Sequence, residues 1–533
     1  MSLDFVDLNG NPLKPQASFA AGGSGSNGEM ARWAPSSKSV DAALLPALRL
    51  GNARAEDLAR NHGIASSGVQ LHIDNIVGDM FRLSARPKWK TLGISEEDAR
   101  AWATDVEQCF QEYAEDEVNC WLDAERKRTF TMLIREAVGT HTRTGEIAAA
   151  ALYLDRPGTR YKTCVKVINP NRISNPGGVP DTDALRGGVE CDRYGAAKAY
   201  HVQNSSVSAF SFGRDWVRIP KFSRHGRQRF LHVFEPTGDG QTRGINQFMS
   251  VMSRLKMLDK YQGTQLETAI VNAMYAAVIE SEMSSEDAYR LIGGESGGSD
   301  LQTYLSNVNA YHEGVDLKLG GSSIPHLMPG EELKLLRPGN TAQGFASFES
   351  SILRYVAAGL NVGYEQLTKD YSKTNYSSAR ASMLETWRYM MGRRKVIASR
   401  YASMIYRLWL EEAIDRRDVT LPRKAKRDFW EAPGAWGCAN WIGSGRLQID
   451  GLKETKELVL KLEAGLISYE KACALMGEDY QELFAQQVRE IAERREAGLP
   501  PPSWMATQVL SPDEQDEQEQ VNGGNKAEST AAA

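Results

Sequence analysis

The order of apolar and polar residues predicts helices near the start of the chain. Between residues 40 and 140, apolar side chains recur every three or four positions, which is the spacing of one helix face. Ser95 followed by Glu96 and Glu97 predicts a helix start, because serine caps helix N-termini and acidic residues favour the first turn. The apolar positions of the first helical stretch are Leu58, Ile64, Val69, Leu71, Ile76 and Met80.

The pattern then changes to short strand-like runs separated by turn residues. The runs IAAAALYL (147–154) and YKTCVKVI (161–168) flank DRPGTR, which predicts a β-hairpin. The run GVECDRYGAAKAYHV (188–202) predicts a second hairpin, and DWVRIP (215–220) and RFLHVFEP (229–236) add short strands. Helices followed by strands make this part of the chain an α+β region.

Two helical patterns follow, separated by a polar insertion. An apolar stripe predicts a helix over 243–276, and FASFESSILRYVAAGL predicts another over 345–360. The insertion between them contains candidate strands at AAVIES (276–281) and IPHLM (324–328). The stripe of the first helix consists of Ile245, Phe248, Met252, Leu255, Leu258, Leu266, Ile270 and Met274.

A polar stretch without glycine or proline, TKDYSKTNYSSARAS (368–382), precedes a very long helical pattern. Either Ser377 or Ser378 is a candidate N-cap for that helix. Further helices are predicted from Leu452 to about Ala497. The apolar positions of the long helix are Trp387, Met390, Met391, Ile397, Tyr401, Met404, Ile405 and Leu408.

Composition and charge narrow the class of protein. The chain has 533 residues, 41% hydrophobic and 25% charged, which is ordinary for a soluble globular protein of several domains. A net charge of −5 and a pI near 6.0 argue against a dedicated nucleic-acid binder. No signal peptide is recognisable, and the longest near-apolar run is too short to span a bilayer. The six scattered cysteines are expected to be reduced thiols.

The motifs that match catalytic signatures lack the flanking elements that those signatures require. Ser296 in GGESGG fits G-x-S-x-G, but a nucleophile elbow needs a strand before the serine and a helix after it. GSGSNG (23–28) fits G-x-G-x-x-G without a βαβ unit around it, and no P-loop is present. The histidines are isolated, and His232 reads as a packed or hydrogen-bonded strand residue. The sequence therefore predicts no enzyme, no cofactor and no metal.

Basic residues gather in four short clusters, each of which is more often a solvated face or a protein contact than a nucleic-acid site. The cluster RRDVTLPRKAKR (416–427) is the best candidate for contacting phosphates, because few acidic residues dilute it. The others are RPKWK (86–90), ERKR (125–128) and RHGRQR (224–229).

The order of several longer motifs resembles the portal proteins of lambda-like tailed bacteriophages, over about Val40 to Leu499. The motifs that carry this resemblance are VDAALLPALRLGNARAEDLARN, DNIVGDMFRLS, ERKRTFTMLIREAV, INPNRISNP, HVFEPTGDGQTRGINQF, IPHLMPGEELKLL, YSSARAS, GRRK and WIGSGRLQIDGLKE. The resemblance implies a non-enzymatic ring of about twelve subunits at one capsid vertex. The terminase packages DNA through such a ring, DNA is later ejected through it, and the tail connector attaches to it.

The resemblance also implies partners and a location. The expected partners are other copies of the chain, the terminase large subunit, the major capsid and scaffolding proteins, and a head-tail adaptor. Double-stranded DNA is expected to pass through without sequence specificity, and no membrane contact is expected. We therefore expect the chain to be part of the virion, at the portal vertex, after assembly in the host cytoplasm.

The portal fold is α+β, with an α/β wing, a long helical stem and spine, a small α/β clip and a helical crown. Mapped onto this chain, it predicts nine segments. These are an N-terminal arm (1–38), a wing (39–242), a stem helix (243–276), a clip (277–342), a returning stem helix (343–366), a tunnel loop (367–382), a spine helix with more wing (383–447), a helical crown (448–505) and a disordered acidic tail (506–533).

In this mapping the polar stretch 368–382 becomes the loop that projects into the tunnel. Lysines there can meet phosphates, while tyrosines and amides can stack or hydrogen-bond without reading sequence. For Arg380 the preferred interpretation is the first turns of the next helix. The alternatives to a portal are a soluble hydrolase using Ser296 and a non-specific DNA-binding protein acting through 416–427. The predicted DNA-facing residues are Lys369, Tyr371, Lys373, Asn375, Tyr376 and Arg380.

Overall fold

The chain folds into two compact units, neither of which is continuous in sequence. Unit 1 comprises Met1–Ile76 and Tyr113–Arg416, and unit 2 comprises Val77–Glu112 and Arg417–Ala533. The nine predicted segments are consecutive in sequence, so they did not predict that Val77–Glu112 folds with residues after Arg416. The computed structural model describes residues 35–204, 215–275, 310, 318–319, 322–323, 342–446, 451–502 and 505.

Three helices come first in the described part of unit 1. They are α2 (Val40–Asn61), α3 (Gly63–Ile76) and α6 (Phe130–Thr144). Ser39 caps α2 through its hydroxyl, and Thr129 caps α6 in the same way. The first helical pattern predicted from the sequence is confirmed up to Ile76, divided into two helices after Asn61. The inclusion of Met80 is wrong, because α3 ends at Ile76 and Met80 directly precedes strand β1.

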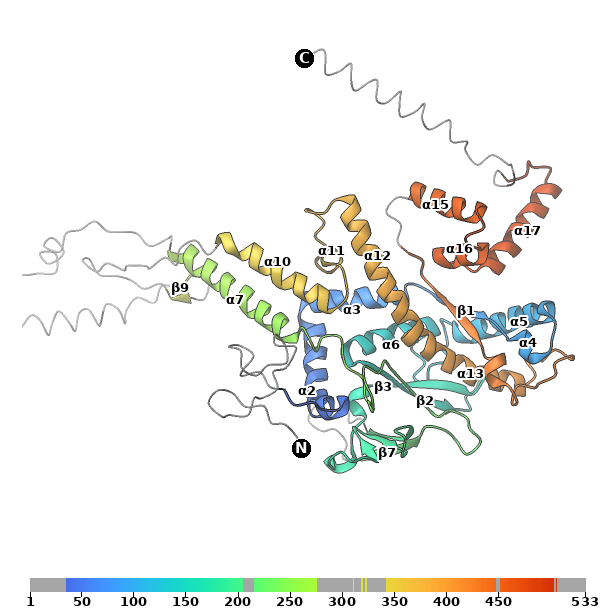
Figure 1. Cartoon of the computed structure of the whole chain (residues 1–533), viewed down its shortest axis with the longest axis horizontal. Helices are drawn as coiled ribbons and strands as arrows, with labels where there is room; N and C mark the ends of the chain where they lie inside the picture. The colour runs from blue at the N-terminus through green and yellow to red at the C-terminus, as the bar shows by residue number, and fades with distance from the viewer. Residues whose placement is uncertain are drawn as a thin grey trace, which may run out of the picture. The chain divides into compact units, whose positions relative to one another are not determined.

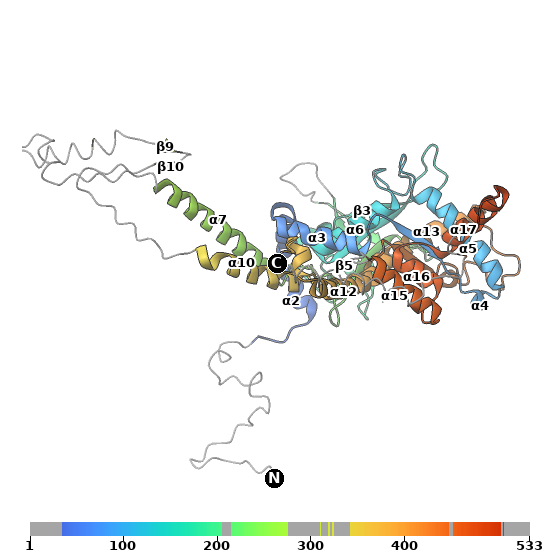
Figure 2. The same ribbon diagram turned by 90° about the horizontal axis from the view of Figure 1, so that it is seen from above.

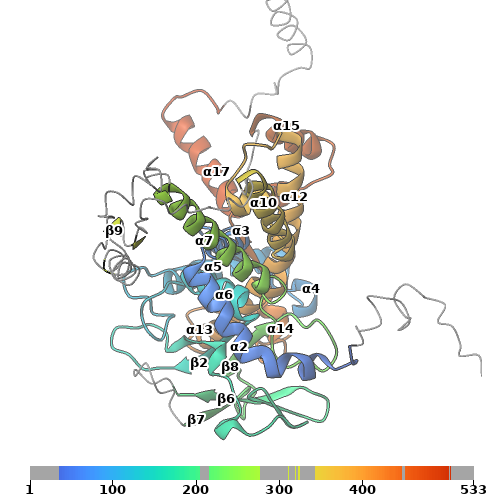
Figure 3. The same cartoon turned by 90° about the vertical axis from the view of Figure 1, so that its left-hand side faces the viewer.

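Two antiparallel sheets form the strand-rich part of unit 1 (Figure 3). Both predicted hairpins are confirmed, because β2 pairs with β3 and β5 pairs with β6. The first sheet has the order β3-β2-β8 and the second β4-β5-β6-β7. The strands are β2 (Glu146–Tyr153), β3 (Thr163–Ile168), β4 (Leu185–Arg186), β5 (Val189–Cys191), β6 (Ala197–Gln203), β7 (Trp216–Pro220) and β8 (Phe230–Phe234), with 3₁₀ turns η2 (Pro170–Arg172) and η3 (Pro176–Gly178).

Apolar side chains from both sheets meet in one buried core. Tyr200 of β6 stacks on Phe230 of β8 with ring centroids 4.1 Å apart. This cluster joins the two sheets, so the strands predicted separately form a single packed body. Its buried members are Ala148, Ala150, Ile168, Ile173, Val189, Cys191, Tyr200, Val202 and Phe230.

The helices α7 (Met252–Tyr275) and α10 (Ala342–Gly359) lie side by side in unit 1 (Figures 1 and 2). The predicted start of the first helix at residue 243 is wrong, because the helix begins at Met252. Residues before it form turns instead, and their polar side chains are held in buried contacts. Asn246, for example, donates its side-chain amide to Asn52 Oδ1 over 2.9 Å.

The predicted long helix is confirmed as a continuous helical run over residues 376–415. It consists of α12 (Tyr376–Arg393), a π-helical turn η4 (Arg394–Ala398) and α13 (Ser399–Asp415). The short helix α11 (Tyr364–Thr368) precedes it. α13 packs on β2, β3 and β8, while α12 contacts α3, so the run connects two different surfaces of unit 1.

Unit 2 contains a strand pair that the sequence pattern did not predict. Strand β1 pairs antiparallel with β11, and Phe81 stacks on Trp441 with centroids 5.6 Å apart. The predicted helix start is confirmed, since Ser95 Oγ accepts a hydrogen bond from the Asp98 amide over 3.0 Å. The elements are β1 (Phe81–Ala85), α4 (Trp89–Leu92), α5 (Glu96–Ala114), α14 (Pro433–Trp436), β11 (Ala439–Gly443), α15 (Gly451–Glu463), α16 (Tyr469–Met476) and α17 (Tyr480–Glu496).

Several predictions fall on residues that lie outside the described ranges. These are the N-terminal arm before residue 35, the candidate strands at 276–281 and 324–328, Ser296 and the acidic tail after residue 505. Within 277–341 the structure describes a two-residue hairpin, β9 (Lys318–Leu319) with β10 (Ser322–Ser323). Among the helices of the described part, none is both long and apolar enough for a bilayer crossing.

Candidate functional site

The polar stretch singled out in the sequence is shorter as a loop than predicted. Only residues 369–375 lie between α11 and α12, so the predicted boundaries 367–382 include parts of both helices. Lys369 ends α11 in the left-handed conformation with φ of 61°, a backbone turn usually made by glycine. Lys369 and Lys373 are both exposed, as is Tyr371.

Local hydrogen bonds give this loop a defined shape. The Asp370 carboxylate accepts from the Ser372 amide over 3.0 Å and from the Ser372 hydroxyl over 2.6 Å. These bonds, with the nearby Lys373 ammonium, lower the pKa of the Asp370 carboxyl, which stays ionised. The Thr374 amide donates to Tyr371 O over 3.2 Å and closes a turn. Because Asp370 offsets one of the two lysines, the loop carries a net charge of +1.

The cap of the following helix is Asn375, so the predicted caps Ser377 and Ser378 are wrong. Asn375 Oδ1 accepts from the Ser378 amide and from the Ser378 hydroxyl, both over 2.8 Å. Its backbone is extended, with φ of −86° and ψ of 163°, as an N-cap requires. The two serines already lie in the first helical turn.

The remaining two predicted site residues belong to α12. Tyr376 is its first residue and is 42% exposed. Arg380 lies one turn further and is half-buried, which confirms the interpretation that it is a helix residue. The structure thus gathers the six predicted residues along one loop and the start of one helix.

The base of the loop is fixed by contacts with α3 and α12. Ser67 of α3 donates its hydroxyl to Leu367 O over 3.0 Å, and the Gly363 amide donates to Thr386 Oγ1 over 3.1 Å. Gly68 packs so closely on Leu360 that an added Cβ would lie 2.9 Å from its Cδ1. Helices α3 and α12 therefore position the base of the loop, while its middle is exposed.

The α7–α10 pair combines a packed base with exposed apolar side chains. Leu255 and Leu258 are buried, whereas Leu266 is 63% exposed and Ile270 is 49% exposed. On α10, Tyr355 is likewise exposed. Among the described residues, the apolar stripe predicted for this helix is therefore buried at Leu255 and Leu258 but exposed at Leu266 and Ile270.

Two of the four basic clusters are engaged in contacts within unit 1. In 125–128, Arg128 pairs with Asp123 over 3.1 Å, and the Arg126 guanidinium lies 4.3 Å from the Trp121 ring. In 224–229, Arg227 donates to Thr163 Oγ1 over 2.6 Å. These arginines support the fold. The clusters 86–90 and 416–427 keep exposed cations and are considered below.

The prediction for His232 is confirmed, and it belongs to a buried ionic cluster. Its Nε2 lies 2.8 Å from Glu146 Oε2, and Arg243 Nε lies 3.0 Å from both oxygens of the same carboxylate. All three side chains are almost fully buried. Among the described residues no group of three or more His, Cys, Asp or Glu side chains is arranged to hold a metal ion.

Comparisons with known proteins identify relatives over nearly the whole chain. The family described as phage portal protein, lambda family, matches residues 26–394. The portal protein of Escherichia phage N15 is 51% identical over 519 residues, covering 97% of each chain. Portal protein B of Escherichia phage lambda is 51% identical over 497 residues, covering 93% of each chain.

Similar solved structures come from the neck of a gene transfer agent particle. The neck of the native particle, computed with C12 symmetry, matches with a TM-score of 0.38 and 12% identity over 81% of this chain and 93% of that chain. The neck of the empty particle, computed with C6 symmetry, matches with a TM-score of 0.38 and 12% identity over 84% of this chain and 94% of that chain.

Sequence similarity decides the family. Identity of 51% over more than nine-tenths of two relatives, together with a family match over residues 26–394, confirms the resemblance found in the motifs. Proteins of this family are structural parts of the virion. The chain belongs to the lambda family of phage portal proteins.

Proposed function

We propose that this portal protein closes into a ring of about twelve copies at one vertex of the capsid. The terminase large subunit docks on the ring and drives the genome through it, and the same tunnel later releases the DNA. A head-tail adaptor binds the ring from outside, while major capsid and scaffolding proteins surround it. Membership of the portal family is the observation that carries this proposal.

The exposed apolar residues of α7 and α10 support ring closure. Leu266 and Ile270 continue the buried stripe of α7, and both are exposed among the described residues. In a ring closed by head-to-tail contacts, the same patch of each copy packs against a different patch of its neighbour. Burying a leucine of this kind contributes on the order of 2 kcal/mol per subunit.

The loop 369–375 is the proposed DNA-facing element of the tunnel. Rotational symmetry would repeat Lys369 and Lys373 around the bore, so each becomes a ring of about a dozen positive charges. The whole assembly would carry a net charge of about −60, because each chain contributes −5. A largely negative bore with few positive rings keeps DNA centred without gripping it, since phosphate contacts position DNA without reading sequence.

Mass measurement of the purified protein tests the ring. Twelve copies of the 59.0 kDa chain give about 700 kDa, and images of the particles should show a central hole. A protein that stays monomeric under all assembly conditions would contradict the proposal. The alternative of a non-specific DNA-binding protein predicts DNA-dependent association instead, so the measurement is made without DNA.

A pair of substitutions on α7 tests which face closes the ring. Leu266→Asn should shift the population from rings to monomers, because it removes an exposed apolar contact that the ring buries. Thr264→Asn is the matched control on the same helix, since residues two apart face different directions. Equal ring yields from the two variants would exclude this face from the subunit contact.

A further inference from the structure

Two basic clusters that are about 330 residues apart in sequence lie side by side in unit 2. The Lys426 amide donates to Leu92 O over 2.9 Å, and the Lys88 amide donates to Ala435 O over 3.0 Å. The Lys426 side chain also packs against Gly93, where an added Cβ would lie 2.7 Å from its Cδ. We call the exposed cations of these two segments the basic face: Lys88, Lys90, Arg423, Lys424, Lys426 and Arg427.

The charges of the basic face are not neutralised within the described residues. No ion pair involves any of its six side chains there, whereas neighbouring cations are paired. Arg86 pairs with Glu470, and Arg100 pairs with Glu96. Asp428 and Glu431 follow in the same loop, so the segment 423–431 keeps an excess of two positive charges. An uncompensated patch of this kind attracts polyanions.

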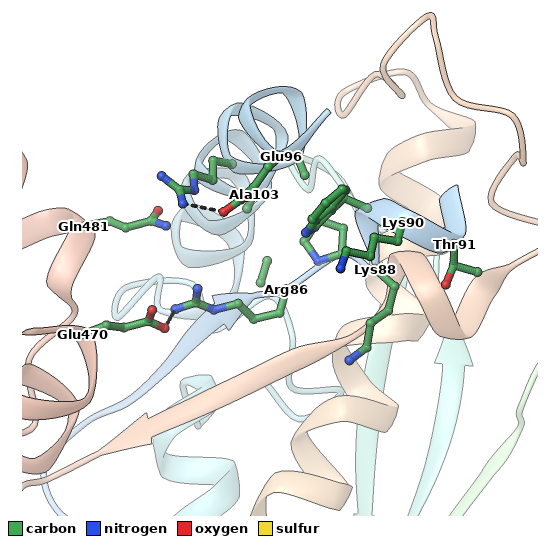
Figure 4. Close-up of a pocket in the computed structure, with 13 residues that line it drawn as sticks. Arg86, Lys88, Lys90, Thr91, Glu96, Ala103, Glu470 and Gln481 are labelled. Carbon is green, nitrogen blue, oxygen red and sulfur yellow. Dashed lines mark hydrogen bonds and ion pairs between the residues drawn. The ribbon is translucent and has the colours of Figure 1, made fainter. Parts of the chain in front are cut away.

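A cavity adjoins the basic face and adds an apolar component (Figure 4). It has a volume of about 510 Å³, with Lys88 and Lys90 on one side and Glu470 and Gln481 on the other, and Trp89 also lines it. Ala99 and Ala103 of α5 also line it. Trp430, four residues after Lys426 of the basic face, is 59% exposed. The surface therefore suits a chain segment with acidic residues next to a few apolar ones.

The sequence supplies such a segment in the same chain. Residues 513–519 read DEQDEQE, which places five carboxylates in seven positions, and Val509, Leu510 and Pro512 come just before them. No lysine or arginine occurs between Arg495 and Lys526. We propose that the acidic segment 511–520 binds the basic face of its own chain, with Leu510 directed to the neighbouring cavity.

The geometry of α17 allows the segment to reach this surface. Gln481, which lines the cavity, lies at the start of α17, and Glu496 ends it about 22 Å away at 1.5 Å per residue. The 14 residues from Ala497 to Leu510 span up to about 46 Å when extended, which is twice the distance to be covered. A segment of this chain can therefore double back along α17 without unfolding it.

Docking of the tail would keep other polyanions away from the basic face. The contacts lie between exposed charges, so they weaken as salt rises and the Debye length falls below about 10 Å. The tail then acts as a built-in competitor of DNA on this part of the surface. This consequence makes the proposal measurable with the full-length protein.

Zero-length carbodiimide cross-linking of the full chain tests the contact directly. Links from the tail carboxylates 513–519 should concentrate on Lys88, Lys90, Lys424 and Lys426, and they should disappear in high salt. Lys453 and Lys471 are exposed lysines of the same unit and serve as internal controls. An even distribution over all these lysines, or links only between isotopically distinct copies, would overturn the proposal.

Binding of a fluorescent DNA duplex at low salt tests the consequence. Changing the five tail acids to their amides should tighten binding about tenfold or more, because the competitor is removed. Adding Lys424→Gln and Lys426→Gln should abolish that gain, whereas adding Lys453→Gln and Lys471→Gln should preserve it. If the tail amides leave the affinity unchanged, or both lysine pairs behave alike, the tail does not cover this face.

Discussion

Replacing Arg243 with methionine is expected to destabilise unit 1 more than any substitution of an exposed ion pair. Its guanidinium donates to the Glu146 carboxylate and to three backbone carbonyls, those of Pro170, Ile173 and Gly187. Glu146 begins β2 of the first sheet, whereas Gly187 connects β4 and β5 of the second, so one side chain ties the two sheets together. Methionine keeps much of the apolar volume but none of these donors.

The magnitude follows from burial. Arg243 is 1% exposed and Glu146 is fully buried, so the variant leaves a buried carboxylate without its cation. Breaking a buried pair in this way costs about 3–5 kcal/mol. Arg218→Met is the matched control, because Arg218 pairs with Glu190 through two bonds of 2.7 and 2.6 Å but is half-exposed. Its loss should cost about 1 kcal/mol or less.

The dependence on pH separates the charge effect from a simple loss of packing. Burial alone would raise the pKa of the Glu146 carboxyl, but Arg243 and His232 outweigh it and lower the pKa to about 2. In the native protein this pair therefore adds stability above pH 4.5, which is lost as the pH falls toward 2. Without Arg243, burial raises that pKa, so the penalty should be larger at pH 7 than at pH 5.

Hydrogen exchange of peptides from β2 and β8 measures the opening free energy of this region in the full chain. The Arg243→Met variant should lose protection by roughly a hundredfold to a few thousandfold, after correction for intrinsic exchange rates. A loss no greater than that of Arg218→Met, or a penalty that does not change between pH 5 and pH 7, would refute the reasoning.

Three further predictions concern the loop and the alternative hypothesis of a hydrolase. Lys373→Ala should weaken DNA packaging or retention while rings still form. Lys395→Ala, at an exposed lysine of the same unit, is the control and should package DNA normally. Normal packaging and retention by both variants would show that Lys373 does not contribute to DNA handling. Asn375→Ala should destabilise the start of α12 by about 1 kcal/mol, which hydrogen exchange should detect as faster exchange of the Ser378 amide. Asn375→Asp should keep the slow exchange, because aspartate caps helices equally well. Unchanged exchange in Asn375→Ala would mean that the cap is dispensable. Ser296→Ala should leave packaging intact, whereas a complete loss would revive the hydrolase.

Features of the fold that depend on neighbouring residues could be predicted from the sequence. The hairpin around DRPGTR has turn residues between two apolar runs, and the helix after Ser95 has its cap and acidic first turn within four positions. The β1–β11 pair has no such local signal. Its strands are five residues long, separated by more than 350 positions, and the first lies between two helical patterns.

Before α7, the apolar periodicity correctly predicted which residue is buried but not the conformation of its backbone. Phe248 is buried, as the stripe required, yet it precedes α7, which begins four residues later. The reason is that Arg243 and Asn246 are held by distant partners, Glu146 and Asn52, and their positions are incompatible with a continuous helix. In the candidate site, polar composition predicted the loop but not the cap of the next helix. Serine and asparagine both fit the N-cap rule, so the sequence could not distinguish Ser377 or Ser378 from Asn375, which is the cap in the structure.

The π-helical turn η4 explains how one helix can serve two surfaces, and apolar spacing could not reveal it. A π-turn inserts one residue into the helix, so every later side chain is rotated by about 100° relative to an uninterrupted helix. Before the turn, α12 buries Thr386 and Met390 and contacts α3, whereas after it α13 buries Tyr401, Ile405 and Leu408 and packs on the strands of the first sheet. At the turn itself, Arg394 donates to the carbonyls of Asn75 and Ile76, which end α3. The turn thus binds the end of α3 and redirects the helix toward the sheet, and through α12 it connects the base of the loop 369–375 to the core of unit 1.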